Sequence, residues 1–355
     1  LLTACVTLSS ANTVYTLQND VSSSGTCFTI SANNITLNGQ GYAINYSQDN
    51  SSSTFGIEIV GYDNVTVKNV NITQGSTSVA SYGVIFSGSN RTVINNVSVT
   101  TSGEEAFGIY QVNSLDSKIS NITVITSGTL ARAIALSGSL NSIITNITIT
   151  TSGGAADGIH LATSSNNTIN NPTVTTTSVG SSTNGIELAS SSNNNTISNP
   201  VITTSGASAY GLYVDASLGN QIFNGSINAS ASNSIQITNI ASRDNNLTNI
   251  SILSANRSVY HLSFGDTING TYLIDMPYIG NYTFTGIGGT INVKNTHGVI
   301  NFLGNVNGTG TNLTSDIIIG NNSVNISTVQ IGLNRSANIT LYNIGSRGFT
   351  TPTIL

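Results

Sequence analysis

Residues 158–176 read GIHLATSSNNTINNPTVTT, and close variants of this stretch recur along most of the chain. The repeat opens on Gly-Ile-x-Ile, continues through Asn-x-Thr and an apolar residue, and ends in a β-branched run such as Ile147-Thr148-Ile149. The opening position falls at nine places, 23 to 27 residues apart: Gly56, Gly83, Gly108, Ala133, Gly158, Gly185, Gly211, Ser234 and Ser258. A fixed period of this length indicates a stacked repeat architecture.

Each repeat contains three short strand-like segments that are separated by turns. Apolar and polar residues alternate within them, so Ile57 and Ile59 are expected to point inward and Glu58 outward. Residue types that favour helices, such as Leu, Glu and Lys, are scarce. The pattern predicts an all-β fold, a single-stranded parallel β-helix with three strands per coil and about 4.8 Å between coils.

A column of asparagines supports this alignment independently. It lies between the second and third segments, where Gly39 and Gly225 take its place in two coils. Asn and Gly tolerate a left-handed backbone, so we expect a tight turn here and side-chain hydrogen bonds from coil to coil. If this turn faces inward, it cannot carry a glycan. The column consists of Asn69, Asn96, Asn121, Asn146, Asn171, Asn199 and Asn249.

The repeat N-x-T-I-x-N, followed by β-branched residues and G-I-x-L, resembles the coils of right-handed parallel β-helix proteins. The stretch from Cys27 to Tyr42 is similar to the entry coil of archaeal-type secreted surface proteins with this fold. The resemblance covers about residues 27–262. It implies the fold rather than an activity, because the fold hosts lyases, hydrolases, adhesins and structural proteins.

Three regions are expected along the chain. Residues 1–26 form an N-terminal cap segment with a disulfide, residues 27–262 form the coils, and residues 263–355 form a β-rich, sandwich-like cap. A cap is required because an open last coil would expose a sheet edge.

Composition narrows the possible partners and the compartment. Only 6% of the 355 residues are charged, against about 25% in an average soluble protein. The nine Lys and Arg residues do not cluster, which excludes a nucleic-acid surface. No apolar run is long enough for a transmembrane segment. No signal peptide is visible, so we expect a mature protein or an excised region.

The two cysteines, Cys5 and Cys27, are expected to form a disulfide, which fits an oxidising compartment. Two alternatives stay open. Both thiols are free and buried, or Leu2-Thr3-Ala4-Cys5 is a lipoprotein processing box and Cys5 carries lipid.

The sequence contains 24 Asn-x-Ser/Thr sequons, so we expect N-linked glycans, no other cofactor, and an extracellular or cell-surface location. The sequons before the second segment, at Asn64, Asn90, Asn166 and Asn194, should face outward and be modified. The expected carriers are Asn45, Asn50, Asn64, Asn90, Asn166, Asn194, Asn224, Asn256, Asn281, Asn312 and Asn334.

One outward-facing column of the repeat contains the candidate catalytic residues. His160 and Glu187 fall on successive coils, and Asp157 lies in the turn before His160. Asp157-Gly-Ile-His faintly resembles one polygalacturonase motif, but the Asp-Asp pair, Gly-His-Gly and Arg-Ile-Lys of that family are missing. Asp157, His160 and Glu187 are therefore catalytic candidates in a minority interpretation. The alternative is a hydrogen-bonded surface pair.

The same column places Ile85, Tyr110, Tyr213 and Tyr260 on one exposed face, as candidates for an interface or a sugar platform. Glu104 and Glu105 are expected to form a cross-coil ion pair with Arg132. The sequence shows no cluster of Cys and His ligands, so no metal is expected.

The rigid repeat and the sparse catalytic groups favour a non-enzymatic structural glycoprotein that self-associates into a surface layer, sheath or filament. Two alternatives stay open. One is an adhesin or carbohydrate-binding surface protein, and the other is a polysaccharide lyase or hydrolase.

Overall fold

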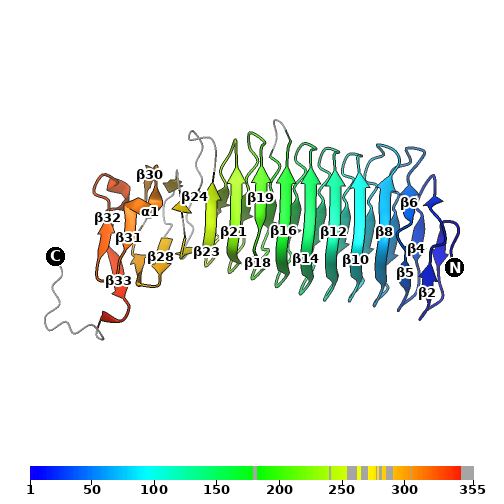
Figure 1. The fold of residues 1–355 in the computed structure, drawn as a ribbon, viewed down its shortest axis with the longest axis horizontal. Helices are drawn as coiled ribbons and strands as arrows, with labels where there is room; N and C mark the ends of the chain where they lie inside the picture. The colour runs from blue at the N-terminus through cyan, green and yellow to red at the C-terminus, as the bar shows by residue number, and fades with distance from the viewer. Residues whose placement is uncertain are drawn as a thin grey trace.

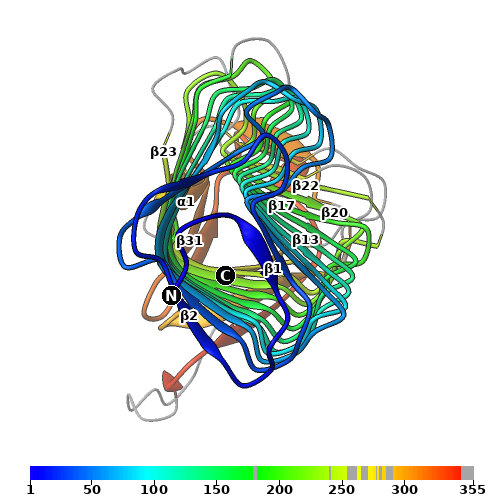
Figure 2. The ribbon, with the colours of Figure 1, turned by 90° about the vertical axis from the view of Figure 1, so that its right-hand side faces the viewer.

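The structure is a computed structural model that describes residues 1–178, 182–239, 241–253, 262–264, 271–276, 278–279, 282–284, 291–304 and 306–344. Successive coils stack into an elongated solenoid with the N-terminus at one end and the strand β33 (Ala337–Leu341) at the other (Figure 1). Viewed along the stack, two parallel sheets face each other across the core (Figure 2). The predicted all-β parallel β-helix is confirmed.

Sheet 1 receives one short strand from each coil. Its strands pair in parallel except the last, β30, which is antiparallel to β27. In spatial order they are β1 (Val6–Leu8), β4 (Phe28–Ile30), β7 (Ile57–Val60), β9 (Val84–Ser87), β11 (Ile109–Val112), β13 (Ile134–Ser137), β15 (Ile159–Ala162), β17 (Ile186–Ala189), β20 (Leu212–Asp215), β22 (Ile235–Thr238), β24 (Leu262–Phe264), β27 (Tyr282–Phe284) and β30 (Gly308–Gly310).

Sheet 2 contains the second and third predicted segments. In most coils these segments join into one strand of eight or nine residues: β8 (Thr66–Gln74), β10 (Val93–Thr101), β12 (Lys118–Thr126), β14 (Ile143–Thr151), β16 (Thr168–Thr176), β21 (Gln221–Ala229) and β23 (Asn246–Leu253). They stay separate in β2 (Val14–Thr16) and β3 (Val21–Ser22), β5 (Thr36–Asn38) and β6 (Ala43–Tyr46), β18 (Thr196–Ser198) and β19 (Val201–Thr204), and β25 (Thr271–Ile274) and β26 (Tyr278–Ile279).

The asparagine column lies inside these long strands, and its backbone is left-handed, as predicted. Asn146 has φ +52°, donates its side-chain amide to Asn121 Oδ1 at 3.3 Å and accepts one from Asn171 at 3.0 Å. The expectation that the column faces inward is wrong, because most of these side chains are exposed and run along the outside of the stack. Asn224, rather than Gly225, occupies the column in its coil, with φ +58° and a contact to Asn249.

The core follows from the alternation within each strand. Ile57 and Ile59 of β7 are fully buried while Glu58 between them is half-exposed, and the same pattern recurs up the stack. Burying such an aliphatic side chain contributes about 1.5–3 kcal/mol. A second, internal ladder of serines satisfies the turn after sheet 1, where the Ser139 amide donates to Ser164 Oγ at 3.0 Å.

The parallel pairing extends beyond the expected coil region at both ends. Residues 1–26 already form a coil, since β1 pairs in parallel with β4 and the Cys5–Cys27 disulfide closes it. At the other end β25 still pairs in parallel with β28 (Ile291–Asn295), so the coils continue past the boundary expected at residue 262. Within sheet 2 the pairing becomes antiparallel between β28 and β29 (Gly298–Phe302).

The remaining C-terminal elements are short and cover the last coil. β33 (Ala337–Leu341) extends sheet 2 antiparallel to β29, and β31 (Ile317–Ile319) pairs with β32 (Val324–Ile326). The helical pieces are α1 (Leu313–Asp316) and the 3-10 turn Ile331–Leu333. Among the described residues, no helix has the length and hydropathy needed to cross a bilayer.

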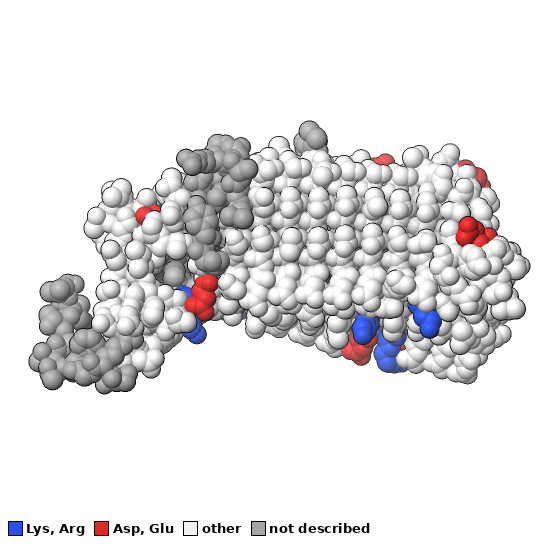
Figure 3. Space-filling model, viewed as in Figure 1, with Lys and Arg blue, Asp and Glu red and all other residues white. Residues whose placement is uncertain are grey.

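Charged residues are rare on the outer surface of sheet 2. The space-filling view shows its long central part as uncharged rows, with Lys and Arg near one edge (Figure 3). His160 of β15 and Glu187 of β17, two of the candidate residues, lie on the other sheet.

Candidate functional site

Two adjacent rows of side chains run along the outside of sheet 1. The outer row is the middle residue of each Gly-Ile-x-Ile, and the strand register places its members on successive coils: Glu58, Ile85, Tyr110, Ala135, His160, Glu187, Tyr213 and Gln236. The turn row is the residue just before the repeat glycine: Phe55, Tyr82, Phe107, Arg132, Asp157, Asn184, Tyr210 and Asn233. Together these rows form the face that we call the sheet 1 face.

Aromatic side chains occupy its N-terminal part. Phe55, Tyr82 and Phe107 stack in the turn row, with ring centroids 5.6 and 5.2 Å apart. Tyr110 of the outer row contacts Phe107 edge-to-face at 5.1 Å. A smaller aromatic pair lies on the C-terminal side, where Tyr210 and Tyr213 stack at 5.3 Å.

A polar cluster separates these two aromatic groups. His160 Nδ1 lies 3.4 Å from Asp157 Oδ2 and 3.4 Å from Glu187 Oε2. Arg132 Nε lies 3.2 Å from Asp157 Oδ2, and its guanidinium stands 5.7 Å from the centre of the Phe107 ring. The side chain of Asp157 is only 4% exposed, while His160 and Glu187 are 12% and 17% exposed. The last two can therefore be reached from solvent.

Asn184 orients both carboxylates. Its backbone N–H donates to Asp157 Oδ1 at 2.8 Å, and its side-chain amide donates to Glu187 Oε2 at 3.0 Å. Asn184 Oδ1 accepts in turn from the Tyr210 amide at 3.2 Å. Sequence reasoning missed Asn184 and the turn-row aromatics, although the residue before each repeat glycine carries the signal.

The environment moves the pKa values of the two carboxyls in opposite directions. Burial, together with the nearby Glu187 carboxylate, raises the pKa of Asp157. Burial also opposes ionisation of Glu187, but His160 outweighs it and lowers the pKa of Glu187 to about 2. Burial of His160 favours its neutral form, yet the two carboxylates prevail and raise its pKa. Such divergence is typical of acid–base sites.

A groove of about 420 Å³ opens between Tyr110 and His160. Ala135 lies between these two residues in the outer row and is buried, so a small side chain forms the floor. Tyr82, Phe107 and Arg132 line one side of the groove.

The structure brings together most of the residues that the sequence singled out. Asp157, His160 and Glu187 form one cluster, and Ile85, Tyr110 and Tyr213 share one row, while Tyr260 lies outside the described residues. The ion pair predicted for Arg132 is wrong, since Arg132 contacts Asp157 of the next coil rather than Glu104 or Glu105.

The expected glycosylation sites stay predictions. Asn50, Asn64, Asn166, Asn194, Asn224 and Asn334 are exposed, and Asn45, Asn90 and Asn312 are partly buried. Asn256 and Asn281 lie outside the described residues. Exposure of Asn121 and Asn146 removes the reason for excluding sugar from the asparagine column.

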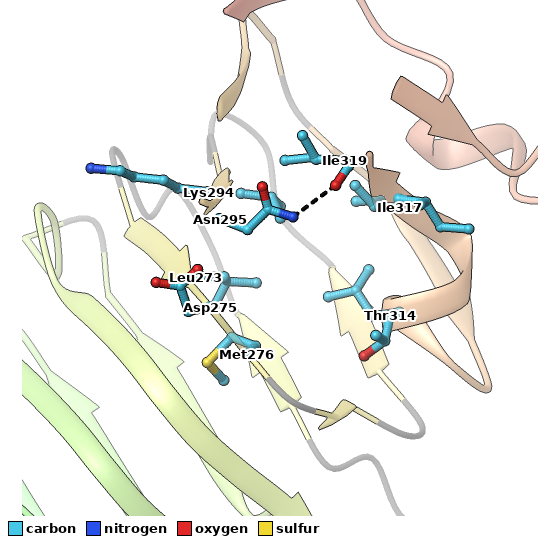
Figure 4. A pocket seen from close by; sticks show the side chains of 11 residues that line it. Leu273, Asp275, Met276, Lys294, Asn295, Thr314, Ile317 and Ile319 are labelled. Atoms are coloured by element: carbon cyan, nitrogen blue, oxygen red, sulfur yellow. Dashed lines mark hydrogen bonds between the residues drawn. The ribbon is translucent and has the colours of Figure 1, made fainter. Parts of the chain in front are cut away.

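A second cavity, of about 200 Å³, lies near the C-terminal end between β25, β28 and β31 (Figure 4). Leu273, Met276 and Ile317 make it largely apolar, and the Asn295 amide is used in a 2.8 Å hydrogen bond to the Ile319 carbonyl. It offers fewer converging polar groups than the sheet 1 face.

Several comparisons agree on the fold. The structure of DFA-IIIase from Arthrobacter chlorophenolicus A6 without its lid is similar with a TM-score of 0.54 and 10% identity, over 73% of this chain and 70% of that chain. The Vag8–C1 inhibitor complex contains a chain with a TM-score of 0.61 and 13% identity, over 82% of this chain and 71% of that chain. A search of curated protein sequences found no match.

The sequence profile of the right-handed β-helix region matches residues 55–239, which include the coils that carry the sheet 1 face. These residues are more than half of the chain, and the structure has the stacked parallel strands that the profile implies. The chain belongs to the right-handed β-helix family.

Proposed function

We propose that this protein is an extracellular or cell-surface carbohydrate-binding protein that holds an extended glycan along the sheet 1 face. The observation that carries the proposal is the order of groups on this face. Aromatic rings lie at both ends of a polar cluster, and the rows that contain them run parallel to the solenoid axis. These rings are partly exposed, apart from the buried Phe107, and aromatic side chains at an accessible surface are typical of recognition sites.

The dimensions suit a chain rather than a single sugar. Tyr82 and Tyr210 are five coils apart, which is about 24 Å at roughly 4.8 Å per coil. The intervening groups offer hydrogen-bond partners, since Glu187 accepts and the imidazole of His160 can donate or accept. A ligand would thus meet apolar ring faces at its ends and polar atoms at its centre.

Charge indicates a neutral glycan. Among the described residues of the two rows, Arg132 is the only Lys or Arg, and it is already paired with Asp157. Glu58 and Glu187 lie in the same outer row. A polyanionic chain would meet more negative than unpaired positive charge on this face.

Affinity measurements on single-residue variants test the proposal. Tyr110→Ala and Tyr213→Ala are expected to weaken binding of a neutral oligosaccharide about tenfold or more, which corresponds to about 1.4 kcal/mol. Tyr42→Ala is the matched control, because Tyr42 is exposed but lies on the sheet 2 side. Equal affinity in all three variants and the wild type would refute binding at the sheet 1 face.

One observation favours a second candidate function, glycan cleavage. The pKa values of Asp157 and Glu187 are displaced in opposite directions at the centre of the face. Release of reducing sugar ends or unsaturated products, lost in Glu187→Gln, would support this candidate over binding alone.

The self-assembling structural role expected from the sequence stays a prediction. Electron microscopy of purified protein would distinguish ordered polymers from isolated rods.

A further inference from the structure

We propose that Asp157, His160 and Glu187 bind one divalent transition-metal ion, with Zn²⁺ as the best match. The proposal does not depend on glycan binding. It begins with His160 Nδ1, which is buried and has no hydrogen-bond partner although two carboxylate oxygens lie near it.

The two contacts of this nitrogen are equal in length. Asp157 Oδ2 and Glu187 Oε2 are each 3.4 Å from Nδ1, and neither contact has the geometry of a hydrogen bond. Two carboxylate oxygens that face one nitrogen are compensated by positive charge, either that of a protonated imidazole or that of a bound cation. A ring proton can point at one oxygen only, whereas a metal ion between the three atoms satisfies them together.

The distances fit such an ion. Zinc binds imidazole nitrogen and carboxylate oxygen at about 2.1 Å, so two tetrahedral ligands lie about 3.4 Å apart. One ligand atom from each of Asp157, His160 and Glu187 can be chosen so that all three lie within 4.8 Å of one another. A bound ion would draw the Asp157 and Glu187 oxygens to the same spacing from each other.

Neighbouring residues hold the proposed ligands in position. Asn184 donates to one oxygen of each carboxylate and so restricts their rotation. Arg132 offsets part of the negative charge. Its guanidinium contacts Asp157 and lies over the Phe107 ring. The partly exposed edges of His160 and Glu187 leave a fourth position open to water or a sugar hydroxyl.

The donor set decides the class of metal. One imidazole with two carboxylates suits Zn²⁺ or Mn²⁺. Ca²⁺ and Mg²⁺ prefer oxygen ligands throughout, and Ca²⁺ needs six to eight of them. The sequence predicted no metal because its three ligands come from two coils and do not form a recognisable motif.

Calorimetric titration of the glycan-free protein with ZnCl₂ tests the proposal. We expect one ion per chain, and binding weaker by more than about 100-fold in His160→Gln and in Glu187→Gln. Asn184→Ala should weaken binding about 10- to 100-fold by releasing the carboxylates. Glu58→Gln changes the same outer row four coils before His160 and should bind like the wild type.

Arg132→Gln provides an opposite and more diagnostic outcome. Removing this nearby positive charge should tighten Zn²⁺ binding by about tenfold. A network that serves only as an ion pair would gain no metal affinity in this variant. Thermal unfolding without metal shows whether each variant folds.

The proposal is overturned if the wild type binds no Zn²⁺, or if His160→Gln and Glu187→Gln bind it as the wild type does. The second result would assign the ion to another site, such as His297. Failure of metal binding leaves the affinity tests with Tyr110→Ala and Tyr213→Ala unaffected, so the two proposals can fail separately.

Discussion

Arg132 Nε lies 3.2 Å from Asp157 Oδ2, and this contact joins two residues that are one coil apart at the centre of the sheet 1 face. Asp157 is almost fully buried, and its carboxyl group is held there by contacts with Arg132, His160 and the Asn184 N–H. The same guanidinium stands over Phe107 and links the aromatic group to the polar cluster.

Loss of this contact should destabilise the fold. Arg132→Ala leaves a buried carboxyl without its cation, and we expect the free energy of unfolding to fall by about 3 kcal/mol. Urea denaturation measures this change. Arg91→Ala is the matched control, because Arg91 pairs with Asp63 at a distance of 3.0 Å on an exposed surface and should matter by less than about 1 kcal/mol. Equal losses would show that burial of Asp157 does not control the effect.

The asparagine column should contribute both conformation and hydrogen bonds. Asn tolerates the left-handed backbone at φ +52° better than Ala does, so Asn146→Ala introduces backbone strain. The substitution also removes the side-chain hydrogen bonds to Asn121 and Asn171. We expect a loss of about 2 kcal/mol. Asn146→Gly restores the backbone freedom and should lose less, whereas Thr148→Ala on the same exposed strand should be nearly neutral. If the Gly variant is as unstable as the Ala variant, the backbone does not contribute.

Alkaline pH should destabilise the N-terminal coils through Tyr46. This phenol is fully buried, its hydroxyl donates to the Ser81 carbonyl at 2.8 Å, and burial raises its pKa above the ordinary value. The contribution is therefore complete below about pH 10, where the unfolded phenol ionises, and is lost as the pH rises further.

The variant Tyr46→Phe separates the ionisation of Tyr46 from the other effects of alkaline pH on stability. The variant should lose about 1 kcal/mol at neutral pH with the hydrogen bond and show a shallower decline above pH 10. Denaturation midpoints at pH 7, 9, 10 and 11 measure both quantities. Tyr42→Phe, at an exposed position, should follow the wild type. Parallel curves for wild type and Tyr46→Phe would contradict the assignment.

The disulfide should stabilise the first coil. Cys5 and Cys27 are 22 residues apart, and closing a loop of this size contributes about 3 kcal/mol by restricting the unfolded chain. The Cys5→Ser/Cys27→Ser variant should unfold at lower urea concentration, and its stability should no longer respond to a reductant. Mass spectrometry of the wild type separates the bridge from a lipid on Cys5. An unreacted pair of thiols in native material would contradict the bridge.

Much of the fold could be predicted because every coil repeats the same pattern of apolar, polar and turn residues. Alternation around Ile57 and Ile59 determined which side faces the core, and asparagines such as Asn146 determined where the backbone turns left-handed. Each of these preferences depends on a residue and its near neighbours, so it is visible in sequence.

The joining of the second and third strands was not visible, because the left-handed asparagine bends a strand without ending it. The outward direction of the column was missed for a related reason. Both faces of the strand contain Asn, Ser and Thr, and the side chain's surroundings are set by the stack rather than by its own segment.

The candidate site divides in the same way. The sequence by itself determined the period, the outer row and the adjacency of His160 and Glu187, because a stacked repeat aligns equivalent positions. Only the tertiary structure decided that Arg132 turns toward Asp157, that Asn184 holds both carboxylates, and that Nδ1 of His160 lies equidistant between them. Those outcomes depend on turn geometry, side-chain rotamers and competition for a few buried polar atoms, which exist only once the coils are packed.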